Sequence, residues 1–401
     1  MRWPLVLLLC LFAGLVAAGG VYLLGSREEP VRAGLSVAEA LGQDTTGYAR
    51  ATGPRDFQFP ADHGPHPAFR TEWWYYTGNL ASADGEGASF GYQFTLFRTA
   101  LTPDTVLARA SGWATNQLYM AHFAVTDVAG ERFYAAERFS RGAAGLAGAQ
   151  AEPFRVWLED WSAEAEGAMP RMRLRARQDG AAIDLVLTPL KPIVLQGDRG
   201  FDPKSDEPGN ASYYYSMTRL ATEGSVTTGG RTHAVEGLSW MDREWSTSVL
   251  GREQIGWDWF ALHLSDGRDL MFYQLRERGG GVSPFTGGVL VAPDGAARHL
   301  GGTDVSLGVT ATWTSPATGA AYPSGWRLRI PAEDLDLAIT PALAAQELDV
   351  TVRYWEGAVR VAGTAGGDGV SGNGYVELTG YGECGAQGAD CGGVRGTRSA
   401  E

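Results

Sequence analysis

Two clusters in the sequence place carboxylates beside tryptophans and tyrosines. One is Glu72-Trp73-Trp74-Tyr75-Tyr76 and the other is Asp242-Arg243-Glu244-Trp245. A carboxyl group buried among apolar and aromatic side chains has a raised pKa and stays protonated near neutrality. Indole and phenol faces attract positive charge by about 0.5–2 kcal/mol when water is excluded. These residue types therefore suit a site in which a buried acid donates a proton and aromatic faces stabilise positive charge.

The second cluster contains two carboxylates at strand spacing. Asp242 and Glu244 are two residues apart, so on a strand both point to one face, and Arg243 and Trp245 point to the other. Repulsion between neighbouring carboxylates raises the pKa of one of them, as an acid–base pair requires. We predict Asp242 or Glu244 as a proton donor. The alternative is a structural ion-pair network with Arg243, which also perturbs pKa values.

In the first cluster, strand alternation places Glu72, Trp74 and Tyr76 on one face. Trp73 then points to the opposite face. A carboxyl that shares a face with Trp74 and Tyr76 could polarise a bound ligand. The alternative is a glutamate that is hydrogen-bonded to the backbone.

A weak internal repeat relates this cluster to a later segment. Residues 73–98 and 257–276 each read as an aromatic strand, an Asp-Gly turn and a returning strand that ends in Arg. Duplication explains this shared order better than chance. Trp73 then corresponds to Trp257, which leaves Asp242-Arg243-Glu244-Trp245 as an extra element upstream of the second copy. That asymmetry favours this cluster for proton chemistry.

Histidines offer a further kind of candidate. His63 and His66 lie in the loop Asp62-His63-Gly64-Pro65-His66, which could supply metal ligands or a general base. Two histidines and one aspartate are a weak metal signal, so a loop-stabilising or ligand-gating role is favoured and no metal site is predicted. His122 lies in an apolar strand and is predicted to be a core histidine.

Composition and patterning indicate the elements that position these residues. The 401 residues can bury two ordinary cores, and a net charge of −13 disfavours nucleic acid as a partner. From Phe57 onward, polar and apolar residues alternate in short runs between turns, as in residues 172–177 and 326–330. We predict an all-β fold of two tandem lipocalin-like (calycin-type) antiparallel β-barrels, each with room for one small ligand.

The N-terminus predicts export. Arg2 precedes an apolar stretch that contains the small-residue site Val16-Ala17-Ala18. Residues 1–25 are therefore predicted to be a signal peptide, and an uncleaved signal anchor is the alternative. The protein is expected to be periplasmic or extracytoplasmic, and anchored to the membrane if this segment is retained.

The remaining chain divides into a linker, two domains and a tail. We assign residues 26–54 to the linker, 55–222 and 223–383 to the two barrels, and 384–401 to a Gly-rich tail. Cys384 and Cys391 in the tail fit a disulfide formed in an oxidising compartment. A free thiol pair and a metal site are the alternatives.

A set of ordered motifs across about residues 57–381 resembles the CrtC/AttH family. That family includes hydroxyneurosporene synthases (carotenoid 1,2-hydratases) and secreted proteins encoded beside ABC transporters. The resemblance implies two lipocalin-like domains, and the chain is more similar to the secreted AttH-like branch. The motifs lie at residues 59–66, 72–75, 120–125, 213–216, 240–245, 256–260, 354–357 and 374–381.

Three functions follow from these observations, and they leave open whether the protein is an enzyme. The first is binding of an isoprenoid, carotenoid or lipid, extended to addition of water to a terminal C=C bond, as in carotenoid 1,2-hydratases. The second is a non-catalytic lipid-binding accessory role in an ABC-type export system, and the third is a secreted hydrolase of unrecognised type. No cofactor is predicted, since no Walker loop occurs and no dinucleotide fingerprint precedes a helix. The predicted ligand-binding residues are Glu72, Trp73, Trp74, Tyr76, Trp245, Trp257, Asp258, Trp259, His63 and His66.

Overall fold

Antiparallel strands joined by tight turns make up nearly all the regular structure of the protein. The structure is a computed structural model that describes residues 45–85, 87–103, 111, 113–248 and 250–381. The predicted leader, Cys384 and Cys391 lie outside these residues. No helix in the described ranges is long and apolar enough to cross a membrane.

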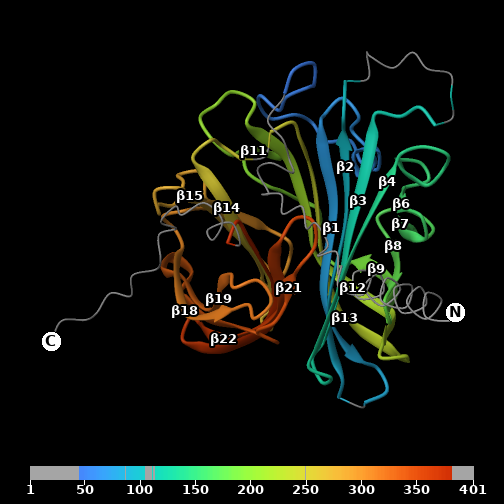
Figure 1. Ribbon diagram of the computed structural model, residues 1–401. Helices are drawn as coiled ribbons and strands as arrows, with labels where there is room; N and C mark the ends of the chain where they lie inside the picture. Colours follow the sequence, from blue (N-terminus) through green and yellow to red (C-terminus); the bar gives the residue numbers. More distant parts are fainter. Residues whose placement is uncertain (1–44, 86, 104–110, 112, 249, 382–401) are drawn as a thin grey trace, which may run out of the picture. The chain divides into compact units, whose positions relative to one another are not determined.

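The first sheet is a nearly closed barrel (Figure 1). Its strands are β1 (Thr71–Ser82), β2 (Ser89–Ala100), β3 (Gln117–Asp127), β4 (Arg132–Arg141), β5 (Ala147–Gln150), β6 (Arg155–Leu158), β7 (Trp161–Ala165), β8 (Met172–Gln178), β9 (Ala181–Pro189), β10 (Val194–Leu195), β11 (Phe201–Pro203), β12 (Ala211–Thr228) and β13 (Arg231–Ser246). They are ordered β4-β3-β2-β1-β13-β12-β9-β8-β7-β6-β5, with β10 and β11 paired to β12. A short 3-10 helix, η1 (Ala61–His63), precedes the sheet.

The second sheet is a curled half-barrel. Its strands are β14 (Gln254–Leu264), β15 (Asp269–Glu277), β16 (Gly287–Val291), β17 (Ala297–Gly301), β18 (Ser306–Thr314), β19 (Ala321–Ile330), β20 (Leu335–Pro341), β21 (Glu347–Leu348), β22 (Tyr354–Ala365) and β23 (Asp368–Thr379), with the 3-10 helix η3 (Pro331–Glu333) before β20. They are ordered β17-β16-β15-β14-β23-β22-β20-β19-β18, with β21 paired to β22. The prediction of an all-β fold with two antiparallel barrel-like sheets is confirmed.

Alternation of side chains along each strand explains where the cores lie. In β8 the apolar residues Met172, Leu174 and Ala176 are buried and alternate with more exposed arginines and glutamine. Such inward faces form one apolar core inside the first sheet and another inside the second. A third cluster, which includes Tyr75 and Trp259, joins side chains from both sheets.

The predicted repeat is present as two matching hairpins. β1 pairs with β2, and β14 pairs with β15, with the Asp-Gly turns between them. The first strand of each hairpin also pairs with the last strand of its own sheet, β1 with β13 and β14 with β23. Tyr75 lies opposite Asp242, and Trp259 lies opposite Glu377 in the same way. β13 therefore corresponds to β23.

This correspondence corrects the predicted place of the second cluster. Asp242-Arg243-Glu244-Trp245 is not an extra element before the second copy, because it belongs to the strand that pairs with β1 in the first sheet. The first sheet extends to Ser246, whereas the predicted division at 222/223 falls within β12. The reason is that β12 and β13 pair along most of their lengths, and cutting there would separate hydrogen-bonded partners.

Candidate functional site

A cavity is lined by residues from both sheets, and we call it the inter-sheet pocket. Its empty volume is about 780 Å³, part of it open to solvent. β1, β2, β12 and β13 line it from the first sheet, and β14, β15, β22 and β23 line it from the second. Lys204, which follows β11, adds one cationic side chain. The pocket therefore combines the outer faces of two related hairpins.

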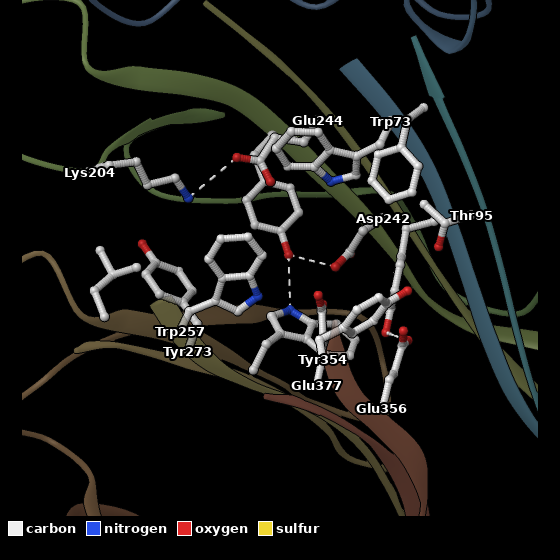
Figure 2. Close-up of a pocket in the computed structure, with 15 residues that line it drawn as sticks. Trp73, Thr95, Lys204, Asp242, Glu244, Trp257, Tyr273, Tyr354, Glu356 and Glu377 are labelled. Atoms are coloured by element: carbon white, nitrogen blue, oxygen red, sulfur yellow. Dashed lines mark hydrogen bonds and ion pairs between the residues drawn. The ribbon is translucent and has the colours of Figure 1, made fainter. Parts of the chain in front are cut away.

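Four carboxyl groups line this pocket. Asp242 and Glu244 come from β13, Glu356 comes from β22 and Glu377 comes from β23. Figure 2 shows the first pair and the second pair on different sides of the pocket. Asp242, Glu244 and Glu356 are 3%, 6% and 1% exposed. Such burial favours the neutral form of a carboxyl group unless nearby charges or donors compensate.

Asp242 is held by three hydrogen-bond donors. The Ser216 hydroxyl, the Tyr214 hydroxyl and Trp240 Nε1 donate to its two oxygens over 2.5, 2.6 and 2.7 Å. Burial raises the pKa of Asp242 to about 7, although these donors act in the opposite direction. Asp242 can therefore exchange a proton near neutral pH while it stays fixed in position.

Glu356 and Glu377 form a tightly coupled pair. They are paired across β22 and β23, and the Tyr75 hydroxyl donates to Glu356 over 2.5 Å. Burial and the neighbouring Glu377 raise the pKa of Glu356 well above its usual range. Burial raises the pKa of Glu377 to about 8. At neutral pH this pair retains at least one proton, because the buried Glu356 and the half-buried Glu377 are adjacent and two carboxylates there repel each other.

Glu244 differs from the other three acids because a cation lies beside it. Lys204 Nζ is 3.4 Å from Glu244 and 2.5 Å from Asp202, whose other oxygen accepts a hydrogen bond from Tyr273. Burial lowers the tendency of Lys204 to be charged, but Asp202 and Glu244 outweigh this effect and raise its pKa. Burial raises the pKa of Glu244, with Lys204 opposing. Glu244 thus belongs to an ion-pair network at one end of the pocket.

Aromatic side chains form much of the remaining wall. Trp73 and Tyr75 come from β1, and Trp257 and Trp259 come from β14. The rings of Tyr75 and Trp259 meet edge to face with centroids 5.1 Å apart. These faces can stabilise positive charge on a ligand in a site from which water is excluded.

Glu72 lies on the opposite face of β1, inside the mouth of the first barrel. Arg98 and Arg243 both donate to its carboxylate, and the backbone N–H of His66 donates over 3.0 Å. Burial opposes ionisation, but the two guanidinium groups outweigh it and hold the pKa of Glu72 well below its usual range. The Arg243 guanidinium also lies 4.0 Å from the centroid of the Trp74 ring. Glu72 is thus a buried counter-ion in a network that does not line the pocket.

The loop that carries His63 and His66 covers the same barrel mouth. Trp74 Nε1 donates to the His63 carbonyl over 2.8 Å, and the His66 ring stacks on Trp245 at 3.7 Å. His63 Nδ1 lies 2.7 Å from the Tyr215 hydroxyl, and burial lowers the pKa of His63 to about 4. These contacts fix the loop to the barrel, apart from the inter-sheet pocket.

Two further predicted ligand-binding residues also point away from the pocket. Tyr76 is buried in the first core, where its hydroxyl donates to Met172 sulfur over 3.6 Å. Asp258 accepts a hydrogen bond from Arg276 at 2.9 Å and another from Tyr381 at 3.0 Å. Burial raises the pKa of Asp258, with Arg276 opposing. The structure therefore brings only Asp242, Glu244, Trp73, Trp257 and Trp259 of the predicted site residues to the pocket.

Other candidate chemistries gain little from the geometry. Within the described residues, no group of three or more His, Cys, Asp or Glu side chains could hold a metal ion. The sequence contains one Gly-x-Ser-x-Gly run at residues 87–91. Its Ser89 is the first residue of β2, directly after a hairpin turn, whereas the serine of this motif in α/β-hydrolases lies on a strand-to-helix turn.

Comparison with known proteins agrees with this architecture. The profile of the AttH-like family matches residues 50–381. The chain belongs to this family. The crystal structure of a protein described as AttH from Nitrosomonas europaea has a TM-score of 0.73 and 35% identity, covering 83% of this chain and 99% of its own. The resemblance drawn from the sequence motifs is confirmed.

A more distant solved structure shares the fold of this AttH-like chain. Kievitone hydratase from Nectria haematococca gives a TM-score of 0.59 and 15% identity, covering 83% of this chain and 96% of its own. The comparison with curated proteins gave no significant match.

Sequence reasoning missed several pocket residues of this AttH-like chain. Glu356 and Glu377 lie within two of the recognised motifs, yet they received no role. Strand alternation within Tyr354-Trp355-Glu356-Gly357 places Tyr354 and Glu356 on one face, which was an available signal. Nothing local marks Lys204, because its importance depends on Asp202 and Glu244.

Proposed function

We propose that the inter-sheet pocket binds an uncharged, largely apolar ligand and adds water to one of its carbon–carbon double bonds. The observation that carries this proposal is the proton-retaining pair Glu356 and Glu377, which shares an aromatic pocket with Asp242. A terminal isoprenoid double bond suits this site, because its protonation gives a tertiary carbocation.

The proposed first step is protonation of carbon by the Glu356–Glu377 pair. The π electrons of the double bond take the proton, and the carboxyl O–H bond breaks. The resulting cation lies among the faces of Tyr75, Trp257 and Trp259, where loss of hydration is offset by cation–π attraction. The same residues favour an apolar ligand before reaction.

In the second step, water attacks the cation and loses a proton to Asp242. With a pKa of about 7, Asp242 is substantially ionised at neutral pH, and three donors stabilise that carboxylate. Sequence reasoning favoured Asp242 or Glu244 as the proton donor. The proposal keeps Asp242 in the reaction as the acceptor, gives the donor role to the second sheet and leaves Glu244 to hold Lys204.

Similarity in fold to a protein named as a hydratase supports testing this reaction first. The experiment incubates the purified protein with acyclic carotenoids and prenylated phenols in D2O and in H2¹⁸O. The expected product is an alcohol with one deuterium on carbon, or one labelled oxygen. Glu356→Gln and Asp242→Asn should suppress it, whereas Asp258→Asn, a buried acid outside the pocket, serves as the control. Product without label would contradict the proposal.

A carrier without catalysis predicts a different result. Lipid retained through purification, seen by native mass spectrometry, together with no labelled product and no effect of Glu356→Gln on retention, would favour the accessory role beside an ABC-type exporter. The exported location also remains a proposal, supported by the leader-like residues 1–25. Cell fractionation with N-terminal sequencing of the mature protein tests it.

A further inference from the structure

His122 links the pocket wall to a less buried acid. It lies on β3, its side chain is almost fully buried, and it does not line the pocket itself. Its Nδ1 is 2.7 Å from the Tyr354 hydroxyl, and its Nε2 is 3.1 Å from Glu137 on β4. Tyr354 lines the pocket, whereas the Glu137 side chain is 13% exposed.

The partners determine the direction of each hydrogen bond. Burial opposes ionisation of Glu137, but hydrogen bonds from His122 and Thr351 outweigh it and lower its pKa. Glu137 is therefore a carboxylate that accepts a hydrogen bond from the Nε2–H group of His122. Nδ1 then accepts the hydroxyl proton of Tyr354, which leaves the phenol oxygen free to accept another.

Glu356 lies at the other end of this series. Tyr354 lies two residues away on β22, so both side chains line the pocket from one face of that strand. Among the described residues, no donor reaches Glu356 Oε2, so this oxygen is free to carry the proton that burial retains. Hydrogen bonds thus join Glu137, His122 and Tyr354, and the shared face of β22 places Tyr354 beside Glu356 at the pocket.

The proposed hydration needs such a connection. Each turnover removes one proton from the Glu356–Glu377 pair and adds one to Asp242. In the part of the chain that the structure describes, Asp242 accepts hydrogen bonds from Ser216, Tyr214 and Trp240, whereas Glu356 accepts one from Tyr75. Glu356 is 1% exposed, so bulk water reaches it poorly, and a bound ligand would exclude water further.

We propose that His122 and Tyr354 carry protons between Glu137 and Glu356. This inference rests on the acid role given to Glu356 above. Inward transfer starts from the other tautomer of His122, with the proton on Nδ1. Glu137 takes a proton from water and passes it to the bare Nε2, Nδ1 gives its proton to the Tyr354 oxygen, and the Tyr354 hydroxyl proton moves to Glu356. This leaves the Nε2–H tautomer described above, and outward transfer reverses each step, so each intermediate group gains one proton and loses one. The His122 tautomer resets before the next transfer.

A second His–Tyr pair in the molecule provides a matched control. His63 Nδ1 and the Tyr215 hydroxyl are also 2.7 Å apart and buried, but neither residue lines the pocket. Tyr354→Phe and Tyr215→Phe therefore each remove one hydroxyl from one buried His–Tyr hydrogen bond. They should lose similar thermal stability. Only Tyr354→Phe interrupts the proposed route.

The test follows exchange of the Glu356 carboxyl proton by infrared spectroscopy after the full-length protein is mixed with D2O. Its O–H to O–D band shift is assigned with Glu356→Gln. We expect Tyr354→Phe and Glu137→Gln each to slow this exchange by about tenfold or more, whereas Tyr215→Phe changes it by less than about twofold. Glu137→Gln provides the same test if Tyr354→Phe does not fold.

The outcomes separate this inference from the proposed function, because no substrate is needed. Slowed exchange in both route variants supports the route even if no hydration is found. Wild-type exchange in both variants overturns it even if the protein proves to be a hydratase. The absence of a protonated Glu356 band at neutral pH also overturns it.

Discussion

The two related sheets, which we call the two repeats, present different acids to the same pocket. In the first sheet, β12 and β13 pair Ser216 with Asp242. At the corresponding register in the second sheet, β22 and β23 pair Glu356 with Glu377. One repeat therefore surrounds a single carboxylate with donors, whereas the other places two carboxyl groups side by side. Under the proposed function, this difference gives one duplicated scaffold both a proton acceptor and a proton donor.

The barrel mouths differ in a related way. Arg98 lies opposite Glu72 on β1 and β2, and Arg276 lies at the equivalent register on β15. In the first repeat Glu72 is shared by Arg98 and Arg243, whereas in the second Asp258 forms an ion pair with Arg276 and accepts a hydrogen bond from Tyr381. The first mouth therefore contains a denser buried charge network. The ionised Glu72 carboxylate offsets part of the positive charge of Arg98 and Arg243.

The largest expected effect is on the rate of hydration, and it distinguishes Glu356 in the second repeat from Ser216 at the corresponding position in the first. Glu356→Gln should lower the rate of hydration by about 10³-fold, since it removes a proposed acid, a group typically worth 10²–10⁴-fold. Ser216→Ala at the corresponding position removes one of three donors to Asp242 and should cost about tenfold. Initial rates of deuterium incorporation from D2O measure both. Equal losses would show that the repeats do not divide the acid and base roles.

A second comparison concerns stability at the two mouths. Glu72→Gln leaves two buried guanidinium groups without their shared carboxylate and should cost about 3–5 kcal/mol of unfolding free energy. Asp258→Asn should cost about 1–3 kcal/mol, because Arg276 is partly exposed and Asn can still accept a hydrogen bond. Urea denaturation at pH 7 gives both values. A larger loss in Asp258→Asn would reverse this account of the mouths.

The pH dependence of stability should differ in sign between the mouth and the pocket. The pKa of Glu377 is raised to about 8 in the folded protein. Its contribution to the unfolding free energy is therefore fully present below its unfolded pKa value near 4.5 and is lost as pH rises through 8. The pKa of Glu72 is lowered, so its contribution is present above that unfolded value and is lost as pH falls.

Two variants test these opposite signs. In the wild type, the unfolding free energy should fall by a few kcal/mol between pH 5 and 8, at roughly 1.4 kcal/mol per pKa unit of the Glu377 shift. Glu377→Gln should remove most of this fall. Glu72→Gln should instead flatten the loss below pH 4.5. Urea titrations at a series of pH values measure both slopes. A Glu377→Gln variant with the wild-type slope would mean that the pocket acids are ionised throughout.

Strand alternation predicted much of this site. It placed Asp242 and Glu244 on one face of a strand and Arg243 and Trp245 on the other, as the structure has them. It also separated Trp73 from Glu72. It could not tell which face of β1 lines the pocket, because both faces are aromatic and both are buried. Apolar periodicity distinguishes a buried face from a wet one, but not two buried faces from each other.

The remaining features of the site depend on contacts between strands that are far apart in the sequence, which the sequence alone does not reveal. The β1–β13 pairing joins segments that the repeat alone assigned to different domains, so the place of Asp242 in the first sheet was missed. Glu356 becomes notable only beside Glu377 and Tyr75, which come from two other strands. His122 was predicted to be a core histidine. It is indeed buried, but its partners Glu137 and Tyr354 are visible only in the fold.

The smallest expected effect concerns the two side chains that reach across the pocket. The Tyr75 hydroxyl of the first repeat donates to Glu356 of the second over 2.5 Å, and Trp259 of the second donates to Tyr214 of the first over 3.4 Å. Tyr75→Phe removes a donor that lowers the pKa of Glu356, so this pKa should rise further.

Tyr75→Phe is expected to cost about 1–2 kcal/mol of unfolding free energy at pH 7. Trp259→Phe removes a longer hydrogen bond, which contributes less, although its smaller ring adds a packing loss. The decisive measurement is the alkaline limb of the pH–rate profile for hydration. That limb should move to higher pH in Tyr75→Phe, because the donor acid keeps its proton longer. It should stay in place in Trp259→Phe, whose contact is with Tyr214 beside Asp242. A shift in Trp259→Phe alone would instead assign the proton donor to the first repeat.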